Sequence, residues 1–157
     1  MIMLKIDISN VRGIKEQLSS VNSSPHTRYY ELDSYRRRIL IVDDEYDLTL
    51  TFKFILRDNG YEVCTYNDPE LALLNFKANF YDMILLDFKM PKLNGFQLSR
   101  ELRKKDNEVK ICFFTASEDV DYDEYKNLLS LSVEEKCFIK KPIDMHQLLW
   151  LIHRILG

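Results

Sequence analysis

The stretch that decides the fold reads MILLDFKMP and spans residues 83–91. Its first four residues are apolar, as in a strand that is covered on both faces of a sheet. Asp87 ends this run, and a loop that contains Pro91 follows it. Open α/β sheets bind their ligands beyond the carboxyl ends of the strands. Asp87 is therefore a candidate functional carboxylate, provided that other parts of the chain bring partners to it.

Similar apolar runs alternate with amphipathic segments along the chain. Strands are predicted at residues 39–42, 61–66, 82–87, 109–115 and 136–140. Helices are predicted at residues 46–59, 69–78, 95–105, 119–131 and 145–156. Parallel neighbours need crossover helices, so this alternation predicts an α/β fold with a doubly wound, five-stranded parallel sheet. The strand at 61–66 is short and more polar than the others and is expected at an edge.

The remaining N-terminal part carries little pattern. Residues 1–36 are interpreted as a poorly defined extension or linker, with a short strand at 1–8, a short helix at 11–18 and a linker at 19–25. Residues 37–157 form the predicted domain. The basic cluster at 36–38 is more typical of a solvated edge before a strand than of a nucleic-acid patch. The net charge of −3 also gives no bulk attraction to nucleic acid or to an anionic membrane.

Location is inferred from what the chain lacks and from its cysteines. No apolar run approaches the roughly 20 residues that span a bilayer, and a secretory signal is not expected. Cys64, Cys112 and Cys137 are odd in number and far apart in sequence. We expect buried, reduced thiols rather than a disulfide or a zinc site. These features together predict a cytoplasmic protein.

Polar residues stand at the end of four predicted strands. They are Asp43 and Asp44 after the first, Asp87 after the third, Thr115 at the fourth, and Lys141 at the fifth. Each has an ordinary explanation alone, as a helix cap, a turn residue, strand filler or a loop lysine. Because the carboxyl ends of parallel strands meet at one edge, we expect the five side chains to converge on one pocket.

The five side chains together suit one kind of chemistry, phosphoryl transfer that depends on a divalent cation. Three clustered carboxylates repel one another, and one would hold its proton unless a cation were present. Mg²⁺ prefers oxygen ligands and needs only one or two protein carboxylates. With the cation bound, Asp87 could act as a nucleophile towards phosphorus. Lys141 would then neutralise the transferred group, and Thr115 would donate a hydrogen bond to it.

At this point the sequence resembles a known family, the CheY-like receiver domains of two-component response regulators. The matching motifs are ILIVDDE at 39–45, LLD at 85–87, MP at 90–91, Gly95, TA at 115–116 and FIKKP at 138–142. The resemblance implies a flavodoxin-like (βα)5 receiver fold. It also implies a Mg²⁺-dependent phosphoacceptor protein rather than an enzyme with an external substrate.

The resemblance also assigns roles to residues. Asp87 would be phosphorylated by a histidine kinase, or by a histidine phosphotransfer protein. The Mg²⁺ ion would be held by Asp43, Asp44, Asp87 and the backbone carbonyl of Lys89. Thr115 and Phe138 would be the switch residues that move after phosphorylation. Lys141 would pair with the phosphoryl group, and the Lys141–Pro142 peptide bond would be cis. Lys140 is expected to face away, because side chains alternate along a strand.

The output of such a switch is expected to be protein binding or onward phosphotransfer, since no effector domain is expected after residue 157. On the last predicted helix, Trp150 is expected to point outward, where it could anchor a partner or lie half exposed. Three alternatives stay open. A phosphorylation-independent pseudo-receiver would bind partners through the same fold. A haloacid dehalogenase-type phosphatase would need an aspartate where Lys89 stands. A DNA-binding regulator would use the arginines at 36–38.

Overall fold

The computed structural model describes residues 36–116 and 137–157. Within these ranges lies a sheet of five parallel strands in the order β2-β1-β3-β4-β5. The strands are β1 (Arg38–Val42), β2 (Glu62–Tyr66), β3 (Met83–Asp87), β4 (Lys110–Ala116) and β5 (Phe138–Lys141). The doubly wound parallel sheet is thus confirmed, and β2 lies at an edge as its polar sequence predicted. The predicted helix at 119–131 and the predictions for 1–35 lie outside the described residues.

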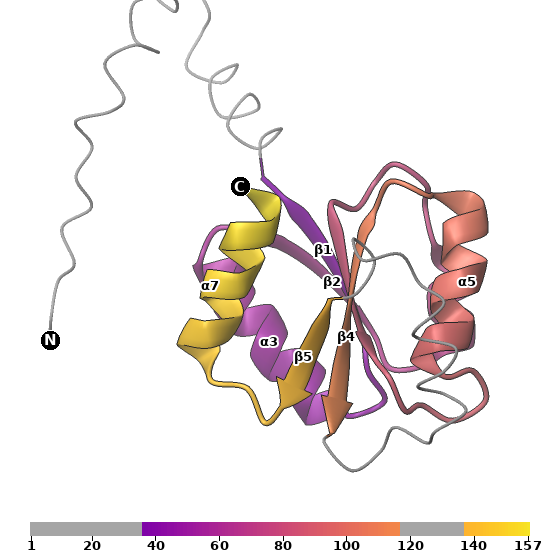
Figure 1. Cartoon of the computed structure of the whole chain (residues 1–157), viewed down its shortest axis with the longest axis horizontal. Helices are drawn as coiled ribbons and strands as arrows, with labels where there is room; N and C mark the ends of the chain where they lie inside the picture. The colour runs from indigo at the N-terminus through magenta and orange to yellow at the C-terminus, as the bar shows by residue number, and fades with distance from the viewer. Residues whose placement is uncertain (1–35, 117–136) are drawn as a thin grey trace, which may run out of the picture. The chain divides into compact units, whose positions relative to one another are not determined.

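Four described helices pack against the two faces of this sheet. They are α3 (Tyr46–Asp58), α4 (Pro69–Asn75), α5 (Gly95–Lys105) and α7 (Met145–Leu156). Figure 1 shows α3 and α7 on one side of the sheet and α5 on the other. Side chains alternate along β3, so Ile84 and Leu86 join the core layer of α5, whereas Met83 and Leu85 join that of α3 and α7. Burial on both faces explains why the central strands are continuously apolar.

Local sequence sets most helix boundaries. Gly60, at a φ of 90°, follows the end of α3 in a conformation that side chains disfavour. The Asp68 carboxylate accepts hydrogen bonds from the first backbone N–H groups of α4, and Asp144 does the same for α7. Helix α4 is three residues shorter than the predicted 69–78. It stops because Phe76 takes an extended backbone conformation and turns its ring into the core, where it is 8% exposed.

The expectation of three reduced cysteines is wrong. Cys112 in β4 and Cys137, directly before β5, form a disulfide across a sequence separation of 25 residues. Phe113 pairs with Phe138 in the parallel register, so the two cysteines are neighbours across adjacent strands. The distance in sequence hid this proximity, which only the strand order creates. Cys64 is a free thiol, as expected, but it is half buried rather than buried.

The arginines at the start of β1 make contacts within the domain. Arg37 pairs with Asp82 at 2.8 Å and donates a hydrogen bond to the carbonyl of Leu156. Arg38 pairs with Glu62 at 3.1 Å and lies over the Phe80 ring. These guanidinium groups therefore tie the start of β1 to its neighbours. Among the described residues, no helix is both long and apolar enough to cross a membrane.

Candidate functional site

The strand register brings the predicted polar residues to one edge of the sheet. Asp87 is the last residue of β3 and pairs with Phe114 of β4. Ala116, one residue after Thr115, pairs with Lys141 of β5. Residues 43 and 44 directly follow β1, the other neighbour of β3. The structure thus places all the predicted strand-end residues on adjacent strands, at their carboxyl ends.

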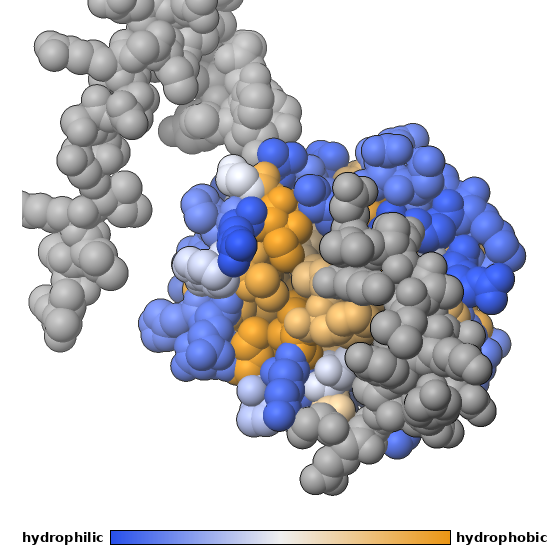
Figure 2. All heavy atoms as spheres, viewed as in Figure 1, coloured by the Kyte–Doolittle hydropathy of each residue, from blue (hydrophilic) through white to orange (hydrophobic). Residues whose placement is uncertain are grey.

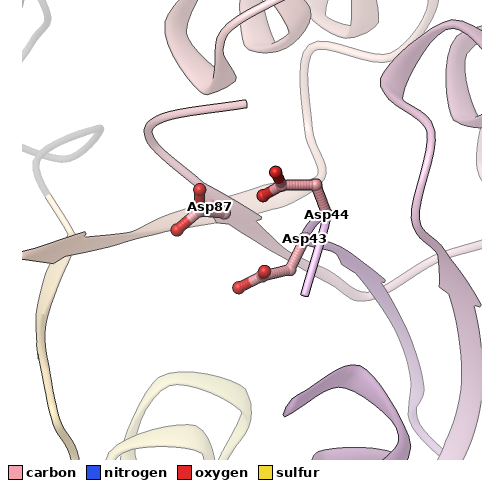
Figure 3. A group of neighbouring side chains, drawn as sticks. All are labelled: Asp43, Asp44 and Asp87. Atoms are coloured by element: carbon pink, nitrogen blue, oxygen red, sulfur yellow. The ribbon is translucent and has the colours of Figure 1, made fainter. Parts of the chain in front are cut away.

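Three carboxylates form a cluster at this edge. Figure 3 shows the side chains of Asp43 and Asp44 beyond β1 and that of Asp87 at the end of β3. One oxygen from each lies within 4.8 Å of the others. Asp43 is fully buried and Asp87 is 7% exposed, whereas Asp44 is open to solvent. The cluster therefore has a buried side and an open side.

Lys141 places one ammonium group among these carboxylates. Its Nζ donates hydrogen bonds to Asp43 Oδ2 at 2.8 Å and to Asp87 Oδ1 at 2.7 Å. A third contact reaches Glu45 Oε1 at 3.2 Å. The Lys141 side chain is itself only 17% exposed. Lys140, the residue before it, is exposed on the other face of β5, as the alternation of side chains predicted.

Burial and charge together shift the ionisation of this cluster. Burial raises the pKa of Asp87 to about 6, with a further increase from the charge of Asp43, while the hydrogen bond from Lys141 opposes the rise. Burial likewise raises the pKa of Asp43, although the hydrogen bonds from Lys141 and from the Glu45 N–H act to lower it. Burial lowers the pKa of Lys141, but its bonds to both aspartates outweigh this and raise it overall. One ammonium group thus does not fully compensate the buried negative charge.

The donor set fits a hard divalent cation. It offers only carboxylate oxygens, and the raised pKa values of Asp43 and Asp87 show that further positive charge would stabilise the ionised site. Mg²⁺ needs few protein ligands because it retains several waters, and the open side at Asp44 leaves room for them. Asp43, Asp44 and Asp87 are the side chains that would hold it.

The remaining predicted residues surround this cluster. The Lys89 backbone N–H donates to Asp87 Oδ2 at 3.1 Å, which places the start of the following loop beside the carboxylate. Thr115 is half buried near the end of β4. Phe138 is 40% exposed and stacks on Phe113 with ring centroids 5.5 Å apart. The roles predicted for the Lys89 carbonyl, Thr115 and Phe138 stay predictions.

The comparisons with known proteins agree with this geometry. Residues 39–153 match the response regulator receiver domain. The chain belongs to this family. It is 33% identical over 122 residues to the transcriptional regulatory protein RprY of Bacteroides fragilis, in a match that covers 76% of the chain and 49% of RprY. The alkaline phosphatase synthesis transcriptional regulatory protein PhoP of Bacillus subtilis is 31% identical over 108 residues, which is 69% of the chain and 43% of PhoP.

A solved receiver domain has the same fold. The non-phosphorylated HemR receiver domain of Leptospira biflexa superimposes with a TM-score of 0.68 at 28% identity. That match covers 78% of the chain and 95% of the HemR domain. The chain spans about half the length of the curated relatives it matches. The family is thus established for the part of the chain that carries the site.

Two residues of this receiver domain site escaped the sequence prediction. The Asn67 side-chain amide donates to the Asp43 carbonyl at 2.7 Å and to Thr49 Oγ1 at 3.0 Å, which fixes the loop that carries Asp43 and Asp44. Glu45 gives Lys141 a third carboxylate. Asn67 directly follows β2, so the same strand-end argument could have found it. No sequence signal links Glu45 to a lysine 96 residues away.

The loop after β3 is held close to the receiver domain site by a glycine and a helix cap. Gly95 begins α5, and its N–H donates to the Phe88 carbonyl at 2.9 Å. Asn94 and Gln97 close this helix end with reciprocal side-chain bonds to each other's backbone N–H. The Lys141–Pro142 bond is cis, as the family resemblance implied. The loop that follows the phosphoacceptor candidate Asp87 thus ends at a capped helix.

We expect Gly95→Ala to lower the free energy of unfolding by about 1–3 kcal/mol. A Cβ at this position would overlap the backbone carbonyl oxygen of Asp87, and backbone cannot move as easily as a flexible side chain. Urea unfolding of Gly95→Ala and of Arg100→Ala, an exposed position on the same helix, would measure the effect. Equal stability of the two variants would show that the loop yields without cost.

Proposed function

We propose that this receiver domain accepts a phosphoryl group on Asp87 from a histidine kinase or a histidine phosphotransfer protein. The observation that carries the proposal is the single ammonium group of Lys141 bonded to both Asp43 and Asp87. A buried carboxylate pair held by one lysine beside an open acidic position is suited to binding a metal and a phosphoryl group together. A purely structural ion pair would not need Asp44, the third carboxylate of the cluster.

The chain's own residues can carry the transfer. An oxygen of Asp87 attacks the phosphorus of a phosphohistidine, the P–N bond breaks, and the imidazole leaves with a proton from solvent. The product is an acyl phosphate on Asp87. Lys141 neutralises charge on the phosphoryl oxygens, and the Lys89 N–H holds the carboxylate in a fixed orientation. Mg²⁺, when bound, supplies further charge neutralisation for the transferred group.

The proposal extends to the output of the domain. Phosphorylation would draw Thr115 towards the phosphoryl group and Phe138 inward, and so shift a pre-existing conformational equilibrium. Phe138 is exposed enough for such a movement to alter the surface around β5. We propose that this surface binds a protein partner, and that the protein acts in the cytoplasm. Catalysis would be limited to the domain's own phosphorylation and dephosphorylation.

We expect incubation with Mg²⁺ and acetyl phosphate to add one phosphoryl group to the protein. Intact-mass measurement would detect the adduct. Asp87→Asn should abolish it, because an amide is not a nucleophile towards phosphorus, and a chelator should abolish it in the unaltered protein. Asp58→Asn, at an exposed position at the end of α3, is the matched control and should be phosphorylated normally.

Two results would overturn this function. One is an adduct that persists in Asp87→Asn, which would place the phosphoryl group elsewhere. The other is the absence both of an adduct and of any Trp150 fluorescence change with Mg²⁺ and beryllofluoride, which mimics the acyl phosphate without hydrolysing. That second outcome would favour the phosphorylation-independent interaction module.

A further inference from the structure

A covalent bond joins the two strands that carry the predicted switch residues. Cys112 belongs to β4, which also contains Thr115, and Cys137 directly precedes Phe138 of β5. Strand β5 is only four residues long, and among the described strands it pairs with β4 alone. The backbone N–H of Phe113 also donates to the Cys137 carbonyl at 2.8 Å. The disulfide therefore anchors the start of a short edge strand.

The disulfide and the exposed phenylalanine lie on opposite faces of the sheet. Cys112 is 1% exposed and belongs to the core layer beneath α3 and α7, and Cys137 packs at the margin of that layer. The stacked rings of Phe113 and Phe138 come one residue later on each strand. Figure 2, in the same view as Figure 1, shows apolar residues of α7 and β5 at the surface. A change at the sulfurs is thus one peptide unit away from the exposed Phe138 ring.

We propose that Cys112 and Cys137 form a reversible redox-modification site that controls how tightly β5 is held against β4. The oxidant class is a low-molecular-weight disulfide, and a low-molecular-weight thiol reverses the reaction. The proposed effect on signalling and the cytoplasmic location rest on the proposed function, whereas the pairing of the two cysteines does not. A reversible bond is inferred because, at the cytoplasmic location we propose, disulfides are usually transient and regulatory rather than structural.

The unequal burial of the sulfurs sets the order of steps. The Cys137 thiolate, which is half buried, attacks one sulfur of the small disulfide and releases one small thiolate. The Cys112 thiolate then attacks the Cys137 sulfur of this mixed disulfide and releases the second. The two cysteine protons end on the two released thiols. The cysteine pair loses two electrons, and the small disulfide gains them.

Oxidation should oppose the activated conformation. The bond holds the start of β5 where the present structure has it, with Phe138 partly exposed. Lys141 stands at the other end of the same strand and contacts Asp87. Movement of β5 relative to β4 after phosphorylation would have to work against the bond. We therefore expect beryllofluoride with Mg²⁺ to bind the oxidised protein roughly five-fold more weakly than the reduced protein, the lower end of coupling between sites.

The first test counts thiols in the whole chain. After equilibration in glutathione buffers of graded ratio, alkylation and intact mass should show one thiol, Cys64, at the oxidising end and three at the reducing end. Cys64→Ser should keep the same transition, whereas Cys137→Ser should lose it. Three thiols in every buffer, or a bond that native protein does not release to reduced glutathione, would overturn the proposal.

The second test measures the restraint itself. Amide hydrogen exchange over residues 137–141 should be slower in the oxidised than in the reduced protein, and Cys137→Ser should match the reduced protein in either buffer. Equal exchange in the two redox states would overturn the restraint on β5, and equal beryllofluoride affinity would overturn its effect on signalling. A thiol transition and an exchange difference without any phosphoryl adduct in either state would instead refute the proposed function and leave the redox site standing.

Discussion

Replacing Lys141 with methionine is expected to lower the free energy of unfolding of the metal-free domain by about 3–5 kcal/mol at neutral pH. The Lys141 ammonium group lies 2.8 Å from Asp43 and 2.7 Å from Asp87, and both carboxylates are buried. Methionine keeps the length of the side chain but not its charge. Two buried carboxylates would then lack their cation, which costs far more than an exposed ion pair contributes.

The size of this effect should depend on pH and on Mg²⁺. Burial already raises the pKa values of both aspartates above 3.8, and losing the ammonium group raises them further. A carboxyl group with a raised pKa in the folded state loses stability as pH rises through that window. The loss in Lys141→Met should therefore grow from about pH 4 upward. Mg²⁺ should restore part of it, because the ion replaces the missing positive charge.

Lys140 offers a matched control for this prediction. It is adjacent in sequence but exposed on the other face of β5, so Lys140→Met should change stability by less than about 0.5 kcal/mol. Urea unfolding of both variants, with a chelator and with excess Mg²⁺, would separate the two positions. A Lys141→Met protein as stable as Lys140→Met in chelator would show that the lysine contributes nothing to holding the carboxylates.

The site was predictable because of where its residues stand in the sequence. Asp43 directly follows a strand, Asp87 and Lys141 each end one, and a parallel sheet necessarily brings such positions to one edge. The order of strands then makes them neighbours. No contact distance had to be known to expect the cluster. The convergence at this edge is therefore a consequence of topology, which hydrophobic periodicity reports well.

The features that sequence reasoning missed depend on pairings between strands or loops. Cys112 and Cys137 are joined only because β5 lies beside β4 in a register that aligns them. Asn67 bonds to the Asp43 carbonyl only because β2 lies beside β1. Helix α4 ended early because Phe76 is used in the core, which a helical pattern on its own cannot reveal. Periodicity predicts which residues are buried, but register decides which side chains meet.

Asp87→Asn is expected to stabilise the metal-free domain by about 2 kcal/mol at pH 7 while abolishing phosphorylation. The folded protein raises the pKa of Asp87 from 3.8 to about 6, so keeping this carboxylate ionised costs about 3 kcal/mol. Asparagine removes that cost. Asparagine has only one side-chain oxygen, however, so the hydrogen bond from the Lys89 N–H is lost, and this lowers the stability by about 1 kcal/mol. The difference between these two effects is the expected increase in the free energy of unfolding.

The gain should vanish in acid. The free energy of unfolding of the unaltered protein should fall as pH rises between about 4 and 6, because the folded state binds the Asp87 proton more tightly than the unfolded state does. Well below pH 3.8 the carboxyl group is protonated in both states, and the two proteins should converge. Contributions from Asp43 are present in both proteins and largely cancel in the difference.

Mg²⁺ should reverse the order of stability. An ion that binds only the folded state at 100 times its dissociation constant stabilises it by about 2.7 kcal/mol, and Asp87→Asn lacks one of the three carboxylates that would hold the ion. Urea titrations at pH 4 and pH 7, each with chelator and with Mg²⁺, would give the four free-energy differences. If the difference in the free energy of unfolding between the two proteins is the same at both pH values, the site does not disfavour the ionised Asp87 carboxylate. The argument that the site needs the positive charge of a metal ion would then fail too.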